Sequence, residues 1–169
     1  MCFQQSPNYE LMGEGYFEGK TVELSNSQKK HLEMFLRDLV GEWELSVKEI
    51  TCKGSDKNPN VVRREADGNA KITESNLGPL RIELNKYYRA DRVSQNELIL
   101  LLNLEAISRF EISDTKLSVS EWLWRYTPDR RLLETIYTIE KSNKGVSIEL
   151  FYFEQGYYIS SQLISLKSH

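Results

Sequence analysis

The densest group of residues with chemical potential lies between Lys116 and Tyr137, in the stretch KLSVSEWLWRYTPDRRLLETIY. It combines a carboxylate, Glu121, with two tryptophans, a proline turn and two adjacent arginines, Arg130 and Arg131. Aromatic rings can pack on a flat conjugated ligand, and arginine binds carboxylates through two parallel hydrogen bonds. This stretch therefore predicts a binding site for an organic ligand.

The rest of the chain offers little for catalysis. His31 lies on the polar side of a predicted helix and His169 is the last residue, so neither has partners for acid–base chemistry. Cys52 has no histidine nearby that would activate it as a nucleophile. The sequence has no phosphate-binding glycine loop, no G-x-S-x-G elbow and no zinc-type spacing. We therefore expect no metal site and no prosthetic group.

The composition is that of one ordinary domain. The 169 residues are 28% charged and carry a net charge of -3, with acids and bases interspersed, which argues against a nucleic-acid partner. No apolar run approaches the roughly 20 residues that span a bilayer, and no secretory signal begins the chain, so we expect no membrane association. Cys2 and Cys52 are the only cysteines, and we expect free thiols in a reducing compartment. We expect an extension over residues 1–24 and one domain over 25–169.

One helix is expected near the start of this domain. The polar run Ser25–Ser27 can cap its free amide groups, and an apolar stripe follows before Gly41 ends the helix. Gly41-Glu42-Trp43 resembles the opening of calycin-type barrels, the lipocalins and their relatives, in which the tryptophan closes the barrel floor. The alternative is a helix stop followed by a core aromatic residue. The expected stripe consists of Leu32, Phe35, Leu36, Leu39 and Val40.

From Trp43 onward, apolar and polar residues alternate as in β-strands. Many short strands without intervening helices predict an antiparallel all-β fold. A chain that avoids open edges closes its sheet, so we expect an up-and-down, lipocalin-like barrel of about ten strands with one short N-terminal helix. The expected strands are 43–52, 60–66, 70–75, 80–90, 96–104, 107–113, 116–126, 131–140, 145–154 and 157–166.

The strand period divides the central stretch into two faces. Glu121 and Arg125 share one face, and Trp122 and Trp124 share the other. If the first face points inward, a ligand or a partner charge must meet the two charged groups, because an unpaired buried charge is costly. If the second points inward, tryptophans and hydroxyls line the interior. In a third interpretation, the strand lies at an edge, its charges face water and its tryptophans fill the core.

The segment from Ser120 to Leu132 resembles the signature of S-type phycobiliprotein lyases. The start at Gly41-Glu42-Trp43 and the tail from Gly145 to Phe153 also fit this family. The chain departs from the signature at Asp129, where the family favours asparagine, and at Leu133, which replaces a second arginine. These departures mark a divergent member. The residues that match in register are Ser120, Glu121, Leu123, Trp124, Thr127, Pro128 and Arg131.

The resemblance implies a calycin-like barrel that binds a linear tetrapyrrole, phycocyanobilin or phycoerythrobilin. Such a protein delivers this bilin to a cysteine of an apo-phycobiliprotein subunit, where a thioether forms. Glu121 would hold the pyrrole nitrogens, Arg131 a propionate, and Trp124 would line or brace the pocket. Arg130 would substitute for the missing second arginine. The remaining candidates for ligand binding are Trp122 and Arg125.

A second hypothesis is a non-enzymatic, calycin-like carrier of a small apolar or tetrapyrrole ligand, because an aromatic-rich barrel with a few polar groups is a general ligand site. In a lyase, Glu121 and Arg131 should reach one cavity, whereas a carrier needs no buried acid. Family membership implies a place in phycobilisome assembly, in a cyanobacterial cytoplasm, a phage-infected host cell or a plastid stroma. It leaves open whether the protein acts alone, as a homodimer or with a second lyase-like subunit.

Overall fold

The computed structural model describes residues 2–9, 21–74, 80–88, 92–100, 106–125 and 131–168, with the backbone alone at 74, 80–88, 92–100 and 123–125. The described residues form one antiparallel β-sheet and one short helix, which confirms the predicted fold class at this level. No helix among them is long and apolar enough to cross a membrane. The elements are α1 (Asn26–Arg37), β1 (Gly41–Ser55), β2 (Asn58–Glu74), β3 (Leu80–Tyr88), β4 (Arg92–Leu100), β5 (Ile107–Ile112), β6 (Lys116–Arg125), β7 (Arg131–Ser142), β8 (Gly145–Glu154) and β9 (Tyr157–Ser168).

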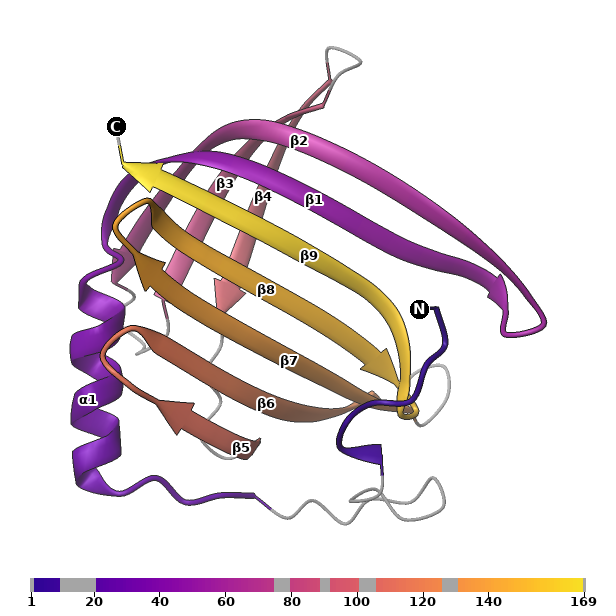
Figure 1. Cartoon of the computed structure of the whole chain (residues 1–169), viewed down its shortest axis with the longest axis horizontal. Helices are drawn as coiled ribbons and strands as arrows, with labels where there is room; N and C mark the ends of the chain where they lie inside the picture. Colours follow the sequence, from indigo (N-terminus) through magenta and orange to yellow (C-terminus); the bar gives the residue numbers. More distant parts are fainter. Residues whose placement is uncertain are drawn as a thin grey trace.

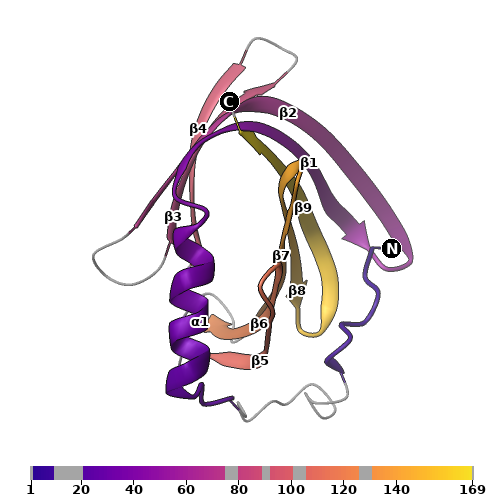
Figure 2. The ribbon, with the colours of Figure 1, turned by 60° about the vertical axis from the view of Figure 1, so that its left-hand side comes forward.

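The strands follow one another in the sheet almost as they do in the chain. Their order is β4-β3-β2-β1-β9-β8-β7-β6-β5, so the first and last strands, β1 and β9, pair in the middle of the sheet. Figures 1 and 2 show a strongly curved sheet, with the long β1–β2 hairpin bending over its concave side and α1 standing beside β5. In the described residues, β4 and β5 form the two edges of the sheet.

Over the residues that the structure describes, the sheet has nine strands where the sequence predicted about ten. The two strands expected at 60–66 and 70–75 are one continuous strand, β2, and the residues between them, Asp67-Gly68-Asn69, lie within it. Gly68 is paired with Leu45 of β1 on one side and with Lys86 of β3 on the other. Pairing on both sides holds the backbone extended here and overrides the local preference of these residues for a turn.

Helix α1 begins where the sequence predicted. The Ser25 hydroxyl accepts a hydrogen bond from the Gln28 amide, and the Gln28 side chain accepts one from the Ser25 amide, a reciprocal cap. Leu32, Phe35, Leu36 and Leu39 are buried. Val40, which was expected to continue this stripe, is 43% exposed because the helix has already ended at Arg37.

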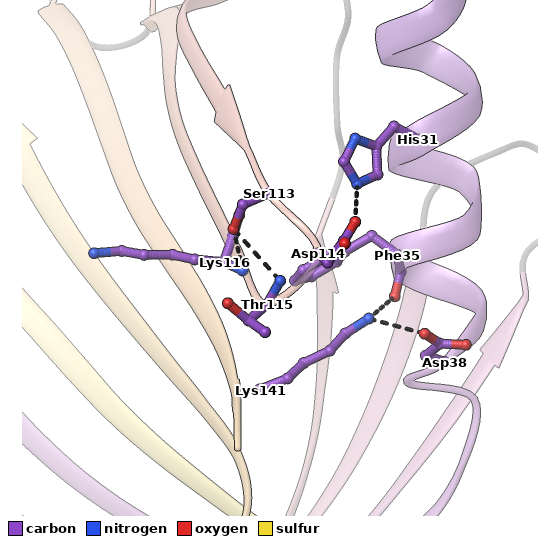
Figure 3. A network of polar contacts seen from close by, with 8 residues as sticks. All are labelled: His31, Phe35, Asp38, Ser113, Asp114, Thr115, Lys116 and Lys141. Carbon is purple, nitrogen blue, oxygen red and sulfur yellow. Dashed lines mark hydrogen bonds and ion pairs between the residues drawn. The ribbon is translucent and has the colours of Figure 1, made fainter.

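Polar contacts fix α1 to the sheet (Figure 3). Nε2 of His31 lies 3.2 Å from Oδ1 of Asp114, in the turn between β5 and β6. Nζ of Lys141, on β7, donates to the Phe35 carbonyl at 2.8 Å and lies 3.2 Å from Oδ2 of Asp38. A cation is favourable at this position because the last carbonyls of a helix carry partial negative charge. These contacts hold α1 at one end of the strands.

The strand register places the core in rows across the concave face. The row next to α1 takes one apolar residue from each of six strands, and none of the six is more than 3% exposed. Trp43 lies beyond this row, and its indole Nε1 donates to the Leu39 carbonyl at 2.9 Å, so side chains fill the α1 end of the concave face. The row consists of Leu117, Ile139, Ile148, Ile164, Val47 and Ala66.

The expectation of free thiols is wrong for this structure, because Cys2 and Cys52 form a disulfide. Residues 2–9, which we call the N-terminal strap, return to the sheet and pack on its outer, convex face. The Phe3 amide donates to the Tyr158 carbonyl at 2.9 Å, and the Ser6 amide donates to the Gly156 carbonyl at 2.7 Å. The strap thus brings Cys2 beside Cys52 of β1, although 50 residues separate them in the chain.

Candidate ligand site

A cavity of about 480 Å³ lies toward the end of the strands away from α1. On β7 its residues are Leu133 to Thr135, whereas Lys141, which contacts α1, is near the other end of the same strand. The volume is within the roughly 300–1,000 Å³ of common ligand pockets. The lining residues are Ala106, Glu121, Trp122, Leu133, Glu134, Thr135, Tyr152, Phe153, Ile159 and Ser160. Successive residues of a strand point to opposite sides of the sheet, so Trp122, Glu134 and Phe153, which the register pairs with one another, border the cavity through their main chain and carry their side chains on the other face.

Polar side chains form a row across this part of the concave face. The register pairs Glu121 of β6 with Thr135 of β7, Thr135 with Tyr152 of β8, and Tyr152 with Ser160 of β9. The row ends at Thr51 of β1. This polar row lies two rows from the fully apolar row of the core. The concave face is therefore apolar near α1 and gains a row of polar side chains at the cavity, among apolar ones such as Leu133 and Ile159.

Glu121 is partly buried and faces the cavity, in the same phase as the fully buried Leu117 and Val119. Oη of Tyr137, two residues from Thr135 on β7, donates to Oε1 of Glu121 at 3.0 Å. Burial, followed by the nearby charge of Glu121 and this hydrogen bond, raises the pKa of the Tyr137 hydroxyl well above its ordinary value. Tyr137 therefore stays a neutral donor that orients the carboxylate of Glu121.

Tyr152 adds a second polar group to the cavity wall. Burial raises the pKa of its hydroxyl, and the charge of Glu49 on β1 raises that pKa further. Glu49 lies on the concave side, in the phase of the buried Leu45 and Val47. Two carboxylates, Glu121 and Glu49, thus lie on this part of the concave face, and carboxylate oxygens accept charge-assisted hydrogen bonds from a ligand that carries N–H donors.

Arg131 has the same strand phase as Leu133 and Thr135 and so belongs to the concave face. Its Nη1 donates to Oε1 of Glu154 at 2.5 Å, with the arginine side chain 42% and the glutamate side chain 20% exposed. The register pairs Leu133 with Glu154, which places this ion pair next to the cavity wall. The structure therefore brings Glu121 and Arg131 to one face of the sheet, with Arg131 held by Glu154 near the cavity.

Trp122 lies on the other face from Glu121. It is 6% exposed and packs with Leu132 and with Tyr9 of the strap, so its side chain is a core residue of the outer face. Arg130 and the side chains of Trp124 and Arg125 lie outside the described residues.

The outer face holds a buried carboxylate, Glu134, that was not predicted from the sequence. Glu134 is 1% exposed, and both of its oxygens accept hydrogen bonds from the strap. The Ser6 hydroxyl donates to Oε1, and Nδ2 of Asn8 donates to Oε2 at 2.8 Å. Asn8 also lies 3.3 Å from the Ser120 hydroxyl. Ser6 and Asn8 thus close the outer face over Glu134.

The buried setting of Glu134 changes its acidity. Burial raises the pKa of its carboxyl, and the hydrogen bonds from Ser6 and Asn8 and the charge of Arg109 offset only part of this rise. Glu134 shares a strand face with Leu132, and the register of the folded sheet adds Trp122 of β6 to the same face. Acids are almost never fully buried unless they are paired, which is the role that Ser6 and Asn8 fill here.

The polar atoms at the cavity are carboxylate and hydroxyl oxygens. In the part of the chain that the structure describes, no three histidine, cysteine, aspartate or glutamate side chains are grouped so that they could hold an ion. The cavity wall combines these hydrogen-bonding oxygens with the aromatic ring of Tyr152. Such a wall can bind and orient an organic molecule.

Comparisons with known proteins add little to this geometry. No family model and no curated protein matches the sequence. Among solved structures, the chain is similar to the dehydratase domain of RzxB from Pseudomonas fluorescens, with 9% identity over 76% of each chain and a TM-score of 0.22. A similarity this low supports no conclusion on fold or function.

Proposed function

We propose that this protein binds a linear tetrapyrrole in the concave cavity and delivers it to a cysteine of an apo-phycobiliprotein subunit. The observation that carries the proposal is Glu121, a carboxylate oriented by a buried tyrosine in the wall of a ligand-sized cavity. Pyrrole N–H groups are donors, and a carboxylate that accepts them forms charge-assisted hydrogen bonds, which are stronger than neutral ones.

Other features of the site are compatible with a bilin. Tyr152 supplies an aromatic ring at the cavity for a conjugated ligand. Arg131, with Arg130 beside it in the sequence, would bind a propionate near the cavity wall. Its guanidinium would then exchange the carboxylate of Glu154 for that of the ligand.

We further propose that β4 and β5, the two edges of the sheet, approach each other and complete a calycin-like barrel around the ligand. The strand order supports this, because it is the order of an up-and-down barrel that is open between these two strands.

The transfer itself requires no nucleophile from this chain. A thiol of the acceptor protein adds across a carbon–carbon double bond of the bilin: the sulfur–carbon bond forms, and the thiol proton ends on the ligand. The contribution of this protein is to hold a flexible ligand in one orientation and to shield it, which is catalysis by positioning. The protein would act wherever phycobilisomes are assembled.

A mixing experiment tests this proposal. The purified protein is combined with phycocyanobilin or phycoerythrobilin and the absorption spectrum is recorded; apo-phycobiliprotein is then added, and colour that resists denaturant is measured. The proposal predicts a spectral change on mixing and covalent colour that forms faster than with bilin and acceptor alone. An unchanged spectrum with both bilins would exclude a tetrapyrrole as the ligand.

One observation favours the second candidate, a carrier without transfer activity. The charge of Arg131 is already compensated by Glu154, so a ligand without carboxylates would leave this ion pair intact. A carrier would change the spectrum of the bilin, or bind another flat apolar molecule, without accelerating covalent attachment. The denaturation step of the same experiment distinguishes the two.

A further inference from the structure

The N-terminal strap is held on the sheet at two separate points. At its start, the disulfide joins Cys2 to Cys52 of β1. Further along, Ser6 and Asn8 donate to the two oxygens of the buried Glu134 on β7. Figure 1 shows the strap passing beside the ends of β8 and β9, between the end of β1 and the start of β7.

Between these points the strap makes few contacts that could hold it alone. Its backbone exchanges hydrogen bonds with β9 and the preceding turn: Phe3 donates to Tyr158, Tyr158 donates to Gln4 at 2.8 Å, and Ser6 donates to Gly156. The last two of these bonds make up the isolated bridge between Gln5 and Tyr157. The entropy cost of ordering a segment of this length is comparable to the gain from such a set of hydrogen bonds. The disulfide adds to these contacts and to the packing of Tyr9 on Trp122, because it keeps Ser6 and Asn8 at a high effective concentration beside Glu134.

The strap also lies behind the cavity wall. Glu134, which it covers on the outer face, stands between Leu133 and Thr135, which line the cavity on the inner face. Trp122, which packs against Tyr9 of the strap, is next to Glu121. The strands that carry the cavity side chains are thus sealed from water on their outer side by the strap.

We propose that the Cys2–Cys52 disulfide is a switch, and that its reduction by a small or protein dithiol releases the strap and loosens the cavity wall. The dithiol attacks as a thiolate, passes through a mixed disulfide and is itself oxidised to a disulfide. Cys2 and Cys52 receive two electrons and two protons and become thiols. Both cysteines are partly exposed, so a dithiol can reach the bond. Release uncovers Glu134, Trp122 and Leu132 and admits water to the outer side of β6 and β7.

Hydrogen exchange on the intact, ligand-free chain tests the switch, and it does so independently of the proposed function. Amide exchange is compared between the oxidised protein and the protein in dithiothreitol. We expect exchange to accelerate at least about tenfold in the strap and in the amides around Trp122 and Glu134, because these would open locally. Amides of the apolar row, such as Ile139 and Ile148, should be unchanged. Equal exchange in both redox states, or equal acceleration throughout the sheet, would overturn the proposal.

Two variants make the result specific. The double substitution Cys2→Ser and Cys52→Ser should reproduce the exchange pattern of the reduced protein and should not respond to dithiothreitol. Trp122 gives an optical readout: its emission should shift to longer wavelength on reduction as water reaches the ring, and Trp122→Phe should abolish that shift. An emission shift that persists in Trp122→Phe, or a response of the double variant to dithiothreitol, would contradict the switch.

Discussion

Glu121 and Glu134 lie on neighbouring strands of one sheet and face opposite sides of it. The register pairs Glu121 with Thr135 and Glu134 with Trp122, so the two carboxylates are one residue step apart across the β6–β7 ladder. Glu134 is sealed under the strap, and its two oxygens accept hydrogen bonds from Ser6 and Asn8. Glu121 lines a cavity and is oriented by Tyr137.

The difference shows how surroundings assign different roles to one residue type. A buried carboxylate whose oxygens are bonded to the chain's own side chains organises the fold, because losing it leaves buried donors unsatisfied. A carboxylate in the wall of a cavity can also meet a ligand. We therefore assign Glu134 to the attachment of the strap and Glu121 to ligand binding. Substitutions at the two positions should have different effects.

The largest effect is expected from removing the buried carboxylate. Glu134→Ala leaves Ser6 and Asn8 as buried donors without their acceptor, and should lower the free energy of unfolding by about 2–4 kcal/mol. Glu121→Ala, the matched change on the other face, should cost about 1 kcal/mol, chiefly for the Tyr137 hydroxyl. Urea denaturation of both variants measures the two losses in the free energy of unfolding. Equal losses would remove the distinction between a structural and a ligand-facing acid.

The free energy of unfolding is expected to depend on pH through the ionisation of Glu134. Burial raises the pKa of its carboxyl above the ordinary value of 4.5, so the folded protein holds the proton more tightly than the unfolded chain. The contribution to stability is then greatest below the ordinary pKa and is lost as pH rises through the raised one. The loss is about 1.4 kcal/mol for each unit by which the two pKa values differ.

Glu134→Gln isolates this contribution, because glutamine does not titrate. The free energy of unfolding of this variant, relative to the unsubstituted protein, should increase as pH rises above 4.5 and level off once the carboxyl is ionised in both states. A series of denaturant titrations across this range checks it. A relative stability that falls with rising pH would mean that Ser6 and Asn8 stabilise the carboxylate more than burial destabilises it.

A smaller effect should follow from loosening Glu121 without removing it. Tyr137→Phe deletes the hydroxyl that donates to Oε1 of Glu121 and leaves the ring in place. One hydrogen bond of this kind contributes about 1 kcal/mol, so bilin affinity should fall roughly fivefold. Spectroscopic titration with phycocyanobilin measures the change. Unaltered affinity would show that Tyr137 serves packing alone.

The smallest effect on stability is expected at the ion pair of Arg131 and Glu154. Both side chains are partly exposed, so Arg131→Ala should change the free energy of unfolding by about 1 kcal/mol or less. Its effect on bilin binding separates the two candidate functions. Weaker binding of a bilin with free propionates, but not of its dimethyl ester, supports a propionate contact; equal binding of both forms by this variant and the unsubstituted protein supports the carrier.

Much of the framework follows from local patterns in the sequence. The cap at Ser25, the buried stripe of α1 and the alternating strands were all predictable, because each depends on neighbouring residues and their period. The two-residue period of a strand also showed that Glu121 lies on the opposite face from Trp122, without deciding which face points inward. The predicted number of strands was too high because Asp67-Gly68-Asn69 has the composition of a turn. Pairing with β1 and β3 holds these residues in one extended strand instead.

The strap could not be predicted in the same way. Ser6 and Glu134 are 128 residues apart in the chain, and Cys2 and Cys52 are 50 apart. Such contacts depend on how the completed sheet brings distant segments together, and no local period encodes them. The sequence therefore predicted an extension over residues 1–24, but neither its disulfide nor the buried acid that the strap covers.

Bilin affinity in a matched pair of variants tests the central assignment most directly. Glu121→Gln and Glu134→Gln remove one charge each from neighbouring strands, one on the cavity side and one on the outer side. We predict that Glu121→Gln weakens phycocyanobilin binding at least about tenfold, or about 1.4 kcal/mol, whereas Glu134→Gln leaves the dissociation constant within about twofold. Unchanged binding by Glu121→Gln, or equal losses in both variants, would contradict the account.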